Sequence, residues 1–206
     1  MWGQACAEPQ TLTEALVLQR AALGGVSVLL GASYSETIKP EHADHLRLVG
    51  LGAMGGTRRL TAAGVLEVIP CHMGQLPAYL AQGLLGCDVA MVQVAPAIDG
   101  SHSYGLATDV TAEIVAKARV VIAEVNDQVP QTHCEKRLAA ADIDCIVYTS
   151  RPPVALGASA VTDTDRAIAR HAAAYIDDGA VLQVGIGAVP EAVMHLLADR
   201  RDLGVH

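Results

Sequence analysis

The sequence has few aromatic residues and no phenylalanine, since Phe, Trp and Tyr together make up 3% of it. Its core must therefore be built from Val, Leu, Ile and Ala, which is typical of parallel sheets covered by helices. No apolar run reaches the length of a membrane-spanning helix, and the chain does not begin with a charged region followed by an apolar one. We therefore expect no contact with a membrane and no signal peptide.

Positive charge is also scarce. The formal net charge is -8 and the isoelectric point is near 5.4, which argues against a nucleic acid or an anionic membrane as partner. The five cysteines are odd in number and form no C-x-x-C pair, which argues against a disulfide framework and a structural zinc site. We expect a cytoplasmic protein with reduced thiols and no bound metal.

The chain is 206 residues long and 51% hydrophobic, which is enough for one sizeable domain. Apolar runs of strand length alternate with helical patterns, and this alternation predicts an α/β fold with an open, mostly parallel sheet flanked by helices. We expect a single domain over residues 1–206. The expected strands are 26–30, 46–49, 65–69, 88–95, 119–125, 143–148 and 180–184. The expected helices are 14–23, 75–85, 110–118, 162–175 and one that starts near 189.

The last expected strand and helix are joined by a glycine loop. Gly185 and Gly187 follow the apolar run 180–184, and Pro190 stands where the first turn of a helix accepts a residue without an N–H. Glycines let the backbone approach a ligand closely, and the helix that follows offers unpaired N–H groups, so the loop could hold a developing oxyanion. A tight strand-to-helix connection with no further role explains the pattern equally well. A dinucleotide fingerprint does not fit, because Pro190 replaces its third glycine.

Three segments together resemble the acetyl-CoA hydrolase/transferase family, which includes 4-hydroxybutyrate CoA-transferases and acetate CoA-transferases. They read VQVAPAIDGSHSYGL from Val92, VIAEVNDQVPQTH from Val121 and DGAVLQVGIGAVPEAV from Asp178. The resemblance implies the open α/β fold shared with relatives of ribose-5-phosphate isomerase. It covers nearly the whole chain but corresponds only to the N-terminal half of such an enzyme, so we expect a C-terminal lobe that is absent from these residues.

In this family a glutamate carboxylate attacks the acyl-CoA thioester, and a glutamyl-CoA thioester then passes CoA to a second acid. By the resemblance the glutamate would lie two residues beyond His206, so we expect no catalytic side chain within the chain and no activity from it alone. The resemblance also places the backbone N–H of Val184 or Gly185 in the oxyanion hole. It implies substrate contacts at Gly185, Ile186, Gly187, Ala188, Val189, Pro190, Asn126 and Gln128.

Several alternatives stay open. Asn126 could equally be a turn-forming residue at the end of a strand. His42 and His45, three residues apart on a short helix, have no third ligand nearby, and a solvated helix face explains them better than a metal site. A sugar-phosphate isomerase on the same fold would need a carboxylate base and a lysine near a phosphate loop. A non-catalytic subunit or binding module is a further alternative.

The resemblance implies coenzyme A and acyl-CoA as substrates, with no permanently bound cofactor, and a small carboxylate such as acetate or 4-hydroxybutyrate as the second substrate. The sequence does not identify the acyl group. It also does not decide whether CoA is transferred to a carboxylate or released by hydrolysis. The family begins with a strand of which only Met1 and Trp2 could be a remnant. Its loss would expose the edge of a neighbouring strand, so we expect pairing with another copy of the chain.

Overall fold

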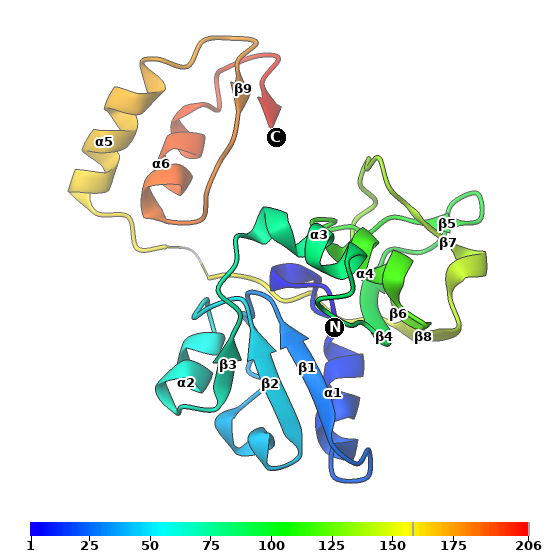
Figure 1. Cartoon of the computed structure of the whole chain (residues 1–206). Helices are drawn as coiled ribbons and strands as arrows, with labels where there is room; N and C mark the ends of the chain where they lie inside the picture. The colour runs from blue at the N-terminus through cyan, green and yellow to red at the C-terminus, as the bar shows by residue number, and fades with distance from the viewer. Residues whose placement is uncertain (158, 206) are drawn as a thin grey trace. The chain divides into compact units, whose positions relative to one another are not determined.

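The chain forms two compact units, seen in a computed structural model that describes residues 1–157 and 159–205 (Figure 1). Unit 1 comprises Met1–Leu156 and unit 2 comprises Gly157–His206. Each unit has its own strands and helices. Whether the range 1–206 behaves as the single domain expected from the sequence stays a prediction.

Unit 1 contains two parallel sheets of three strands each. One has the order β1-β2-β3 and the other has the order β4-β6-β8, while β5 and β7 form a small antiparallel pair. The near-continuous apolar character of β1, β4 and β6 is what parallel strands with two covered faces require. The strands are β1 (Val26–Leu30), β2 (Leu46–Gly50), β3 (Leu66–Val68), β4 (Val89–Val94), β5 (Ser101–His102), β6 (Val120–Asn126), β7 (Leu138–Ala139) and β8 (Cys145–Thr149).

Helices pack on the two faces of these sheets. Side chains of α1 and α2 join the core around Val28, Leu30 and Leu48, whereas α3 and α4 cover the alternate face through Leu76, Leu80 and Ile114. The α-helices of unit 1 are α1 (Gln10–Gln19), α2 (Thr57–Ala62), α3 (Leu76–Ala81) and α4 (Thr111–Lys117). Short 3₁₀ turns are η1 (Ala5–Ala7), η2 (Pro40–Asp44), η3 (Met73–Gln75) and η4 (Ala140–Asp142).

The first three residues run alongside β4. Trp2 forms a parallel bridge with Met91, the Met91 N–H donates to the Met1 carbonyl at 3.0 Å, and the Gly3 N–H donates to Met91 at 3.4 Å. The N-terminal residues therefore pair with the Val89–Met91 part of the β4 edge, in the place of the strand remnant expected there. The expected association with another copy of the chain stays a prediction.

Unit 2 consists of two helices and a two-stranded parallel sheet. Its elements are α5 (Asp163–Ala173), β9 (Val181–Leu182), α6 (Ala188–Leu196) and β10 (Gly204–Val205). Thr162 caps α5 in a capping box with Asp165, which confirms the predicted start of that helix. β10 pairs in parallel with β9.

Several element boundaries differ from the sequence-based expectation. Helix α1 starts at Gln10, and its N-cap residue makes no side-chain capping bond. The carboxylate of Glu124, far away in the sequence, accepts a hydrogen bond from the first turn instead. It ends at Gln19, and the following residues form turns that lead into Gly24 with a φ of 73°. The expected helix 75–85 is shorter, since α3 ends at Ala81 and the turn η3 precedes it, and β9 is shorter than the apolar run that predicted it.

The predicted fold class is confirmed, since mostly parallel sheets are flanked by helices. Among the residues that the structure describes, no helix combines the length and the apolar character needed to cross a membrane.

Gly55 lies in the loop that follows β2, and Gly64 lies in the turn that follows α2. Gly55 has a φ of 59°, and an added Cβ would collide with the Ser33 carbonyl oxygen, whereas Gly64 has a φ of 71° in open space. We expect Gly64→Ala to lower the free energy of unfolding by roughly 1–2 kcal/mol from backbone strain alone. Gly55→Ala should cost more, because a backbone collision adds to the same strain.

Denaturant unfolding of the three variants measures this order. Gly86→Ala is the control, because Gly86 has neither a positive φ nor a neighbour within 4 Å of an added Cβ. Equal losses for Gly55→Ala and Gly64→Ala would contradict the close approach of the Gly55 backbone to Ser33.

Candidate functional site

Buried polar side chains occupy one face of the sheet β4-β6-β8 at the carboxyl ends of its strands. Gln93 pairs in register with Glu124, and Asn126 pairs with Thr149. Glu124 and Asn126 point to the same face because side chains alternate along a strand, and both are fully buried. The opposite face carries Val and Ala side chains that pack on α4. The polar face thus lies at the end of the sheet where open α/β folds bind ligands.

The Glu124 carboxylate caps helix α1. It accepts hydrogen bonds from the backbone N–H groups of Thr11 at 2.9 Å and Leu12 at 3.3 Å. The hydroxyls of Thr11 and Thr149 donate to its other oxygen at 3.0 and 3.2 Å. The two N–H groups have no partner inside the helix, and a negative group next to them also matches the helix dipole. A carboxylate of β6 therefore does what an N-cap side chain usually does.

The Asn126 side chain has a hydrogen-bonding partner in unit 1 for each of its polar groups. Its amide nitrogen donates to Gln93 Oε1 at 3.2 Å and to the Arg151 carbonyl at 2.8 Å. Its oxygen accepts from the N–H groups of Gln128 at 3.1 Å and Arg151 at 3.3 Å. The bond to Gln128 is the turn-forming interaction that was one of the two alternatives for Asn126. A direct contact between Asn126 and substrate stays a prediction.

Arg151 carries the network back to helix α1. Its guanidinium donates two hydrogen bonds to the Glu14 carboxylate, both at 2.9 Å, and a longer one to Thr11 at 3.4 Å. The hydrogen bonds from Arg151 hold the pKa of the Glu14 carboxyl below its usual value. The segment after β8 is thus fixed to α1 by its side chain and to β6 by its backbone.

A second buried carboxyl, Glu8, lies beyond the end of β1 and is 1% exposed. Its oxygens accept from the hydroxyls of Ser35 at 2.8 Å, Thr13 at 3.0 Å and Ser33 at 3.4 Å. Burial raises the pKa of Glu8, and the hydroxyl bonds oppose this only in part. The sequence analysis missed this group, because nothing in the local pattern shows that three hydroxyl residues on two segments converge on it.

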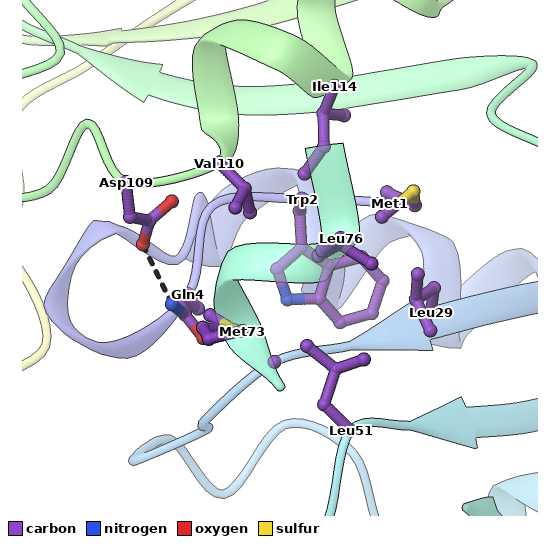
Figure 2. A pocket seen from close by; sticks show the side chains of 11 residues that line it. Met1, Trp2, Gln4, Leu29, Leu51, Met73, Leu76, Asp109, Val110 and Ile114 are labelled. Carbon is purple, nitrogen blue, oxygen red and sulfur yellow. Dashed lines mark hydrogen bonds between the residues drawn. The ribbon is translucent and has the colours of Figure 1, made fainter. Parts of the chain in front are cut away.

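A small cavity lies around Trp2, between the N-terminal residues and the starts of α3 and α4 (Figure 2). Its volume is about 10 Å³, which is the size of a single water molecule. At its rim Gln4 donates to Asp109 at 2.8 Å and accepts from the Ala32 N–H at 3.0 Å. The cavity is too small for a substrate, and Gln4 serves to join the loop before α4 to the end of β1.

A larger hollow of about 390 Å³ lies next to the pair β5 and β7. Arg137 at its wall is held by Ser101, whose hydroxyl and carbonyl accept from the guanidinium at 2.8 and 3.2 Å. Asp99 lines the same wall, so the positive charge of Arg137 is accompanied by a negative one. The lining residues are Ile98, Asp99, Ser101, Gln131, Thr132, His133 and Arg137.

The glycine loop lies in unit 2 between β9 and α6. Gly187 is the N-cap of α6 and has a φ of 144°, which favours glycine, whereas Gly185 does not have a positive φ. Pro190 falls in the first turn of the helix, as predicted. Within the part of the chain that the structure describes, the N–H groups of Gly185 and Ile186 donate to no protein acceptor. Ile186 is 72% exposed and Val184 38%, so this loop is open to a ligand.

The remaining loop residues lie along the start of α6. Ala188, Val189 and Pro190 are half-buried and form its first turn. The loop thus belongs to unit 2, while Asn126 and the exposed Gln128 belong to unit 1. The predicted roles of all these residues stay predictions.

The expected solvated helix face is wrong for His42, which is buried, whereas His45 is exposed. His42 Nδ1 accepts a hydrogen bond from the Lys39 N–H at 3.2 Å and so closes the first turn of η2. Over residues 1–157 and 159–205, no group of three or more His, Cys, Asp or Glu side chains is arranged to hold a metal ion.

Comparisons with known proteins match unit 1 to a family model and the whole chain to several relatives. The family model described as "Acetyl-CoA hydrolase/transferase N-terminal domain" matches residues 1–157. The 4-hydroxybutyrate coenzyme A transferase of Clostridium kluyveri is 34% identical over all of this chain and 49% of its own length. The butyryl-CoA:acetate CoA-transferase of Anaerostipes caccae is 32% identical over all of this chain and 48% of its own length.

The fold has a close counterpart among solved structures. RipA from Yersinia pestis superposes with a TM-score of 0.89 at 27% identity, covering all of this chain and 51% of that protein. The chain therefore spans about half the length of the relatives that it matches.

The two carboxyls Glu8 and Glu14 should affect stability with opposite dependence on pH. Burial raises the native pKa of Glu8 above 4.5, so the native state holds its proton more tightly than the unfolded state. The stability of the wild type relative to Glu8→Gln should therefore be greatest below pH 4.5 and decrease as the pH rises through the native pKa. Chemical denaturation of both proteins between pH 3 and 8 measures the difference.

Glu14→Gln is the matched control of opposite sign. The native pKa of Glu14 lies below 4.5, so the contribution of its ionised form should be present above pH 4.5 and lost as the pH falls through the native pKa. If the stability difference from wild type changed with pH in the same direction for both variants, burial would not control the titration of Glu8.

Proposed function

Because the chain belongs to the acetyl-CoA hydrolase/transferase family, we propose that its protein transfers CoA between a short-chain acyl-CoA and a small carboxylate. Acetyl-CoA is the proposed donor, and acetate or 4-hydroxybutyrate is the proposed type of acceptor. The names of the two matched relatives support transfer over hydrolysis, since both are CoA-transferases. Coenzyme A enters as a substrate and leaves as a product.

The proposed reaction is covalent. A glutamate carboxylate attacks the acyl-CoA carbonyl, releases CoA as a thiolate and forms an acyl-glutamyl anhydride. The thiolate then attacks the glutamyl carbonyl, releases the acyl group as a carboxylate and leaves a glutamyl-CoA thioester. The incoming carboxylate takes over CoA by the same two steps in reverse. Dividing the exchange in this way replaces one difficult step by easier ones.

The observation that carries the proposal is the open glycine loop of unit 2. Each attack places negative charge on a carbonyl oxygen, and the loop offers backbone N–H groups that no described protein acceptor uses. The proposed donor to this oxygen is the N–H of Val184 or Gly185. Residues from Gly185 to Pro190 would then lie along the acyl group. Preorganised donors of this kind stabilise the transition state without reorganisation.

The nucleophilic glutamate is proposed to lie outside residues 1–206. The two most buried carboxyls of unit 1, Glu8 and Glu124, are each held by three or more hydrogen bonds from hydroxyl or N–H groups. Such carboxyls are poor nucleophiles because their lone pairs are already engaged. We therefore expect no turnover from residues 1–206 on their own.

An exchange assay tests the function. Acetyl-CoA is incubated with 4-hydroxybutyrate or butyrate, and the new acyl-CoA is measured by liquid chromatography and mass spectrometry. The full product of the source gene should form it, and residues 1–206 alone should not. Turnover by residues 1–206 alone would place the nucleophile within the chain, and no turnover by the full product would remove the transferase proposal.

Gly187→Ala tests the glycine loop in the full product. Its φ of 144° favours glycine, so a methyl group should displace the loop and its donors. We expect kcat to fall by about 10²-fold, the typical effect of losing one oxyanion donor. Gly86→Ala is the matched control in open space and should leave kcat unchanged. Wild-type kcat in a folded Gly187→Ala protein would contradict a role for this loop.

A further inference from the structure

The sheet β4-β6-β8 ends at β8 (Figure 1). Its other outer strand, β4, pairs with the N-terminal residues through the bridge between Trp2 and Met91. β8 pairs with β6, and among the residues of unit 1 that the structure describes no strand pairs with its other side. An edge strand exposes a row of unpaired backbone N–H and carbonyl groups, which can pair with a strand of another chain.

The strand β3, at the edge of the other sheet, is protected against such pairing. It has three residues, the charge of its Glu67 is paired with Arg47 at 2.6 Å, and Pro70 follows it. β8 has five residues and contains neither a charge nor a proline. It leaves Tyr148 78% exposed and Ile146 40% exposed. Natural sheets block their edges with charges, prolines and short strands, so β8 lacks the features that would keep it unpaired.

The pairing of β8 with β6 shows which of its backbone groups are free. The Asp127 N–H donates to the Thr149 carbonyl at 3.2 Å, so Thr149 directs its carbonyl toward β6. Because the backbone groups of successive residues in a strand point to opposite sides, those of Ile146 and Tyr148 point away from β6. No backbone carbonyl that the structure describes outside the strands accepts from these two N–H groups. The edge therefore offers the N–H and carbonyl groups of both residues.

Two copies of β8 are complementary when they run antiparallel. With Val147 on the two-fold axis, Ile146 of one copy lies opposite Tyr148 of the other, and this pair exchanges both of its backbone hydrogen bonds. The axis repeats the pair, so the free groups of both residues find partners. An aromatic side chain opposite a β-branched one is also a favourable cross-strand pair. Both side chains share the face of the sheet that carries Ala123 and Val125, so its apolar layer would continue across the axis.

We propose that β8 is an interface between two copies of this protein, in which the two β8 strands pair antiparallel about Val147 and join their sheets into one. A second copy fits the edge because the same five residues supply both sides of the contact without placing one charge opposite another. Pairing over five residues makes a small interface, so the dimer should form in a concentration-dependent way. The proposal does not depend on the proposed CoA-transferase function.

Cross-linking of the full product of the source gene tests the register. The two Val147 residues would form a non-hydrogen-bonded pair, whose Cα atoms are about 4.5 Å apart and thus within the range of a disulfide. With Cys145→Ser as the parent, Val147→Cys should give a disulfide-linked dimer on a non-reducing gel after oxidation by oxidised glutathione. Tyr148→Cys in the same parent is the control, because it would meet its copy along a diagonal of about 7–8 Å, which is too long to bridge.

Tyr148→Lys tests the contact without a new cysteine. It removes the aromatic side chain from both cross-strand pairs and adds a charge to each edge, so the dimer dissociation constant from sedimentation velocity should rise by about tenfold or more. Because Tyr148 is 78% exposed, the melting temperature of the monomer should not change. Val68→Lys is the matched control, since Val68 is an apolar residue of the edge strand β3 that is 44% exposed, and it should leave dimerisation unchanged.

Three results would overturn the proposal. The first is a full product that stays monomeric at high concentration. The second is a dimer that neither links through Val147→Cys nor weakens with Tyr148→Lys, because a different surface would then form it. Amide hydrogen exchange gives the third, since the N–H groups of Ile146 and Tyr148 should become protected only as the dimer forms. Their protection in the monomer would mean that another segment of the same protein, and not a second copy, covers the edge.

Discussion

The contact between the Glu124 carboxylate and the first turn of α1 is the constraint on which the carboxyl end of the sheet depends. The carboxyl group is fully buried and would be costly to leave without partners. Helix α1 supplies two N–H groups and a hydroxyl, and β8 supplies a second hydroxyl. The position of α1 in turn sets Glu14, which holds Arg151. The buried Glu124 carboxyl thus orders helix α1 and the segments that follow β6 and β8.

The two faces of the sheet β4-β6-β8 are held by different kinds of interaction. On one face valines and alanines pack on α4, and their interactions have no direction beyond close contact. On the other face each hydrogen bond demands a partner at one distance and angle, so the segments after the strands are held in defined positions. The apolar face accounts for much of the stability, while the polar face defines where the loops lie. This division suits a protein that must present loops to a ligand.

The strands, most helix positions and the fold class could be predicted because they follow from apolar runs and local signals such as the Thr162 cap. The polar networks could not, since they join residues far apart in the sequence. Glu124 lies 113 residues from Thr11, and Glu8 lies 27 from Ser35. The motif around Asn126 was recognised by resemblance, but its hydrogen bonds to Gln93 and Arg151 have no local signature. The glycine loop was predicted as a turn before a helix, and its chemical role stays a prediction.

The long separation between Glu124 and α1 has a consequence for the order of folding. Contacts between distant residues form late because closing a long loop costs entropy before any contact offsets it. During synthesis α1 leaves the ribosome long before residue 124 and has no side-chain cap of its own. A ten-residue helix without a cap is marginal in water. The cap of the first helix can therefore form only after β6 has been made, and until then α1 has only its packing on β1 and β2 to stabilise it.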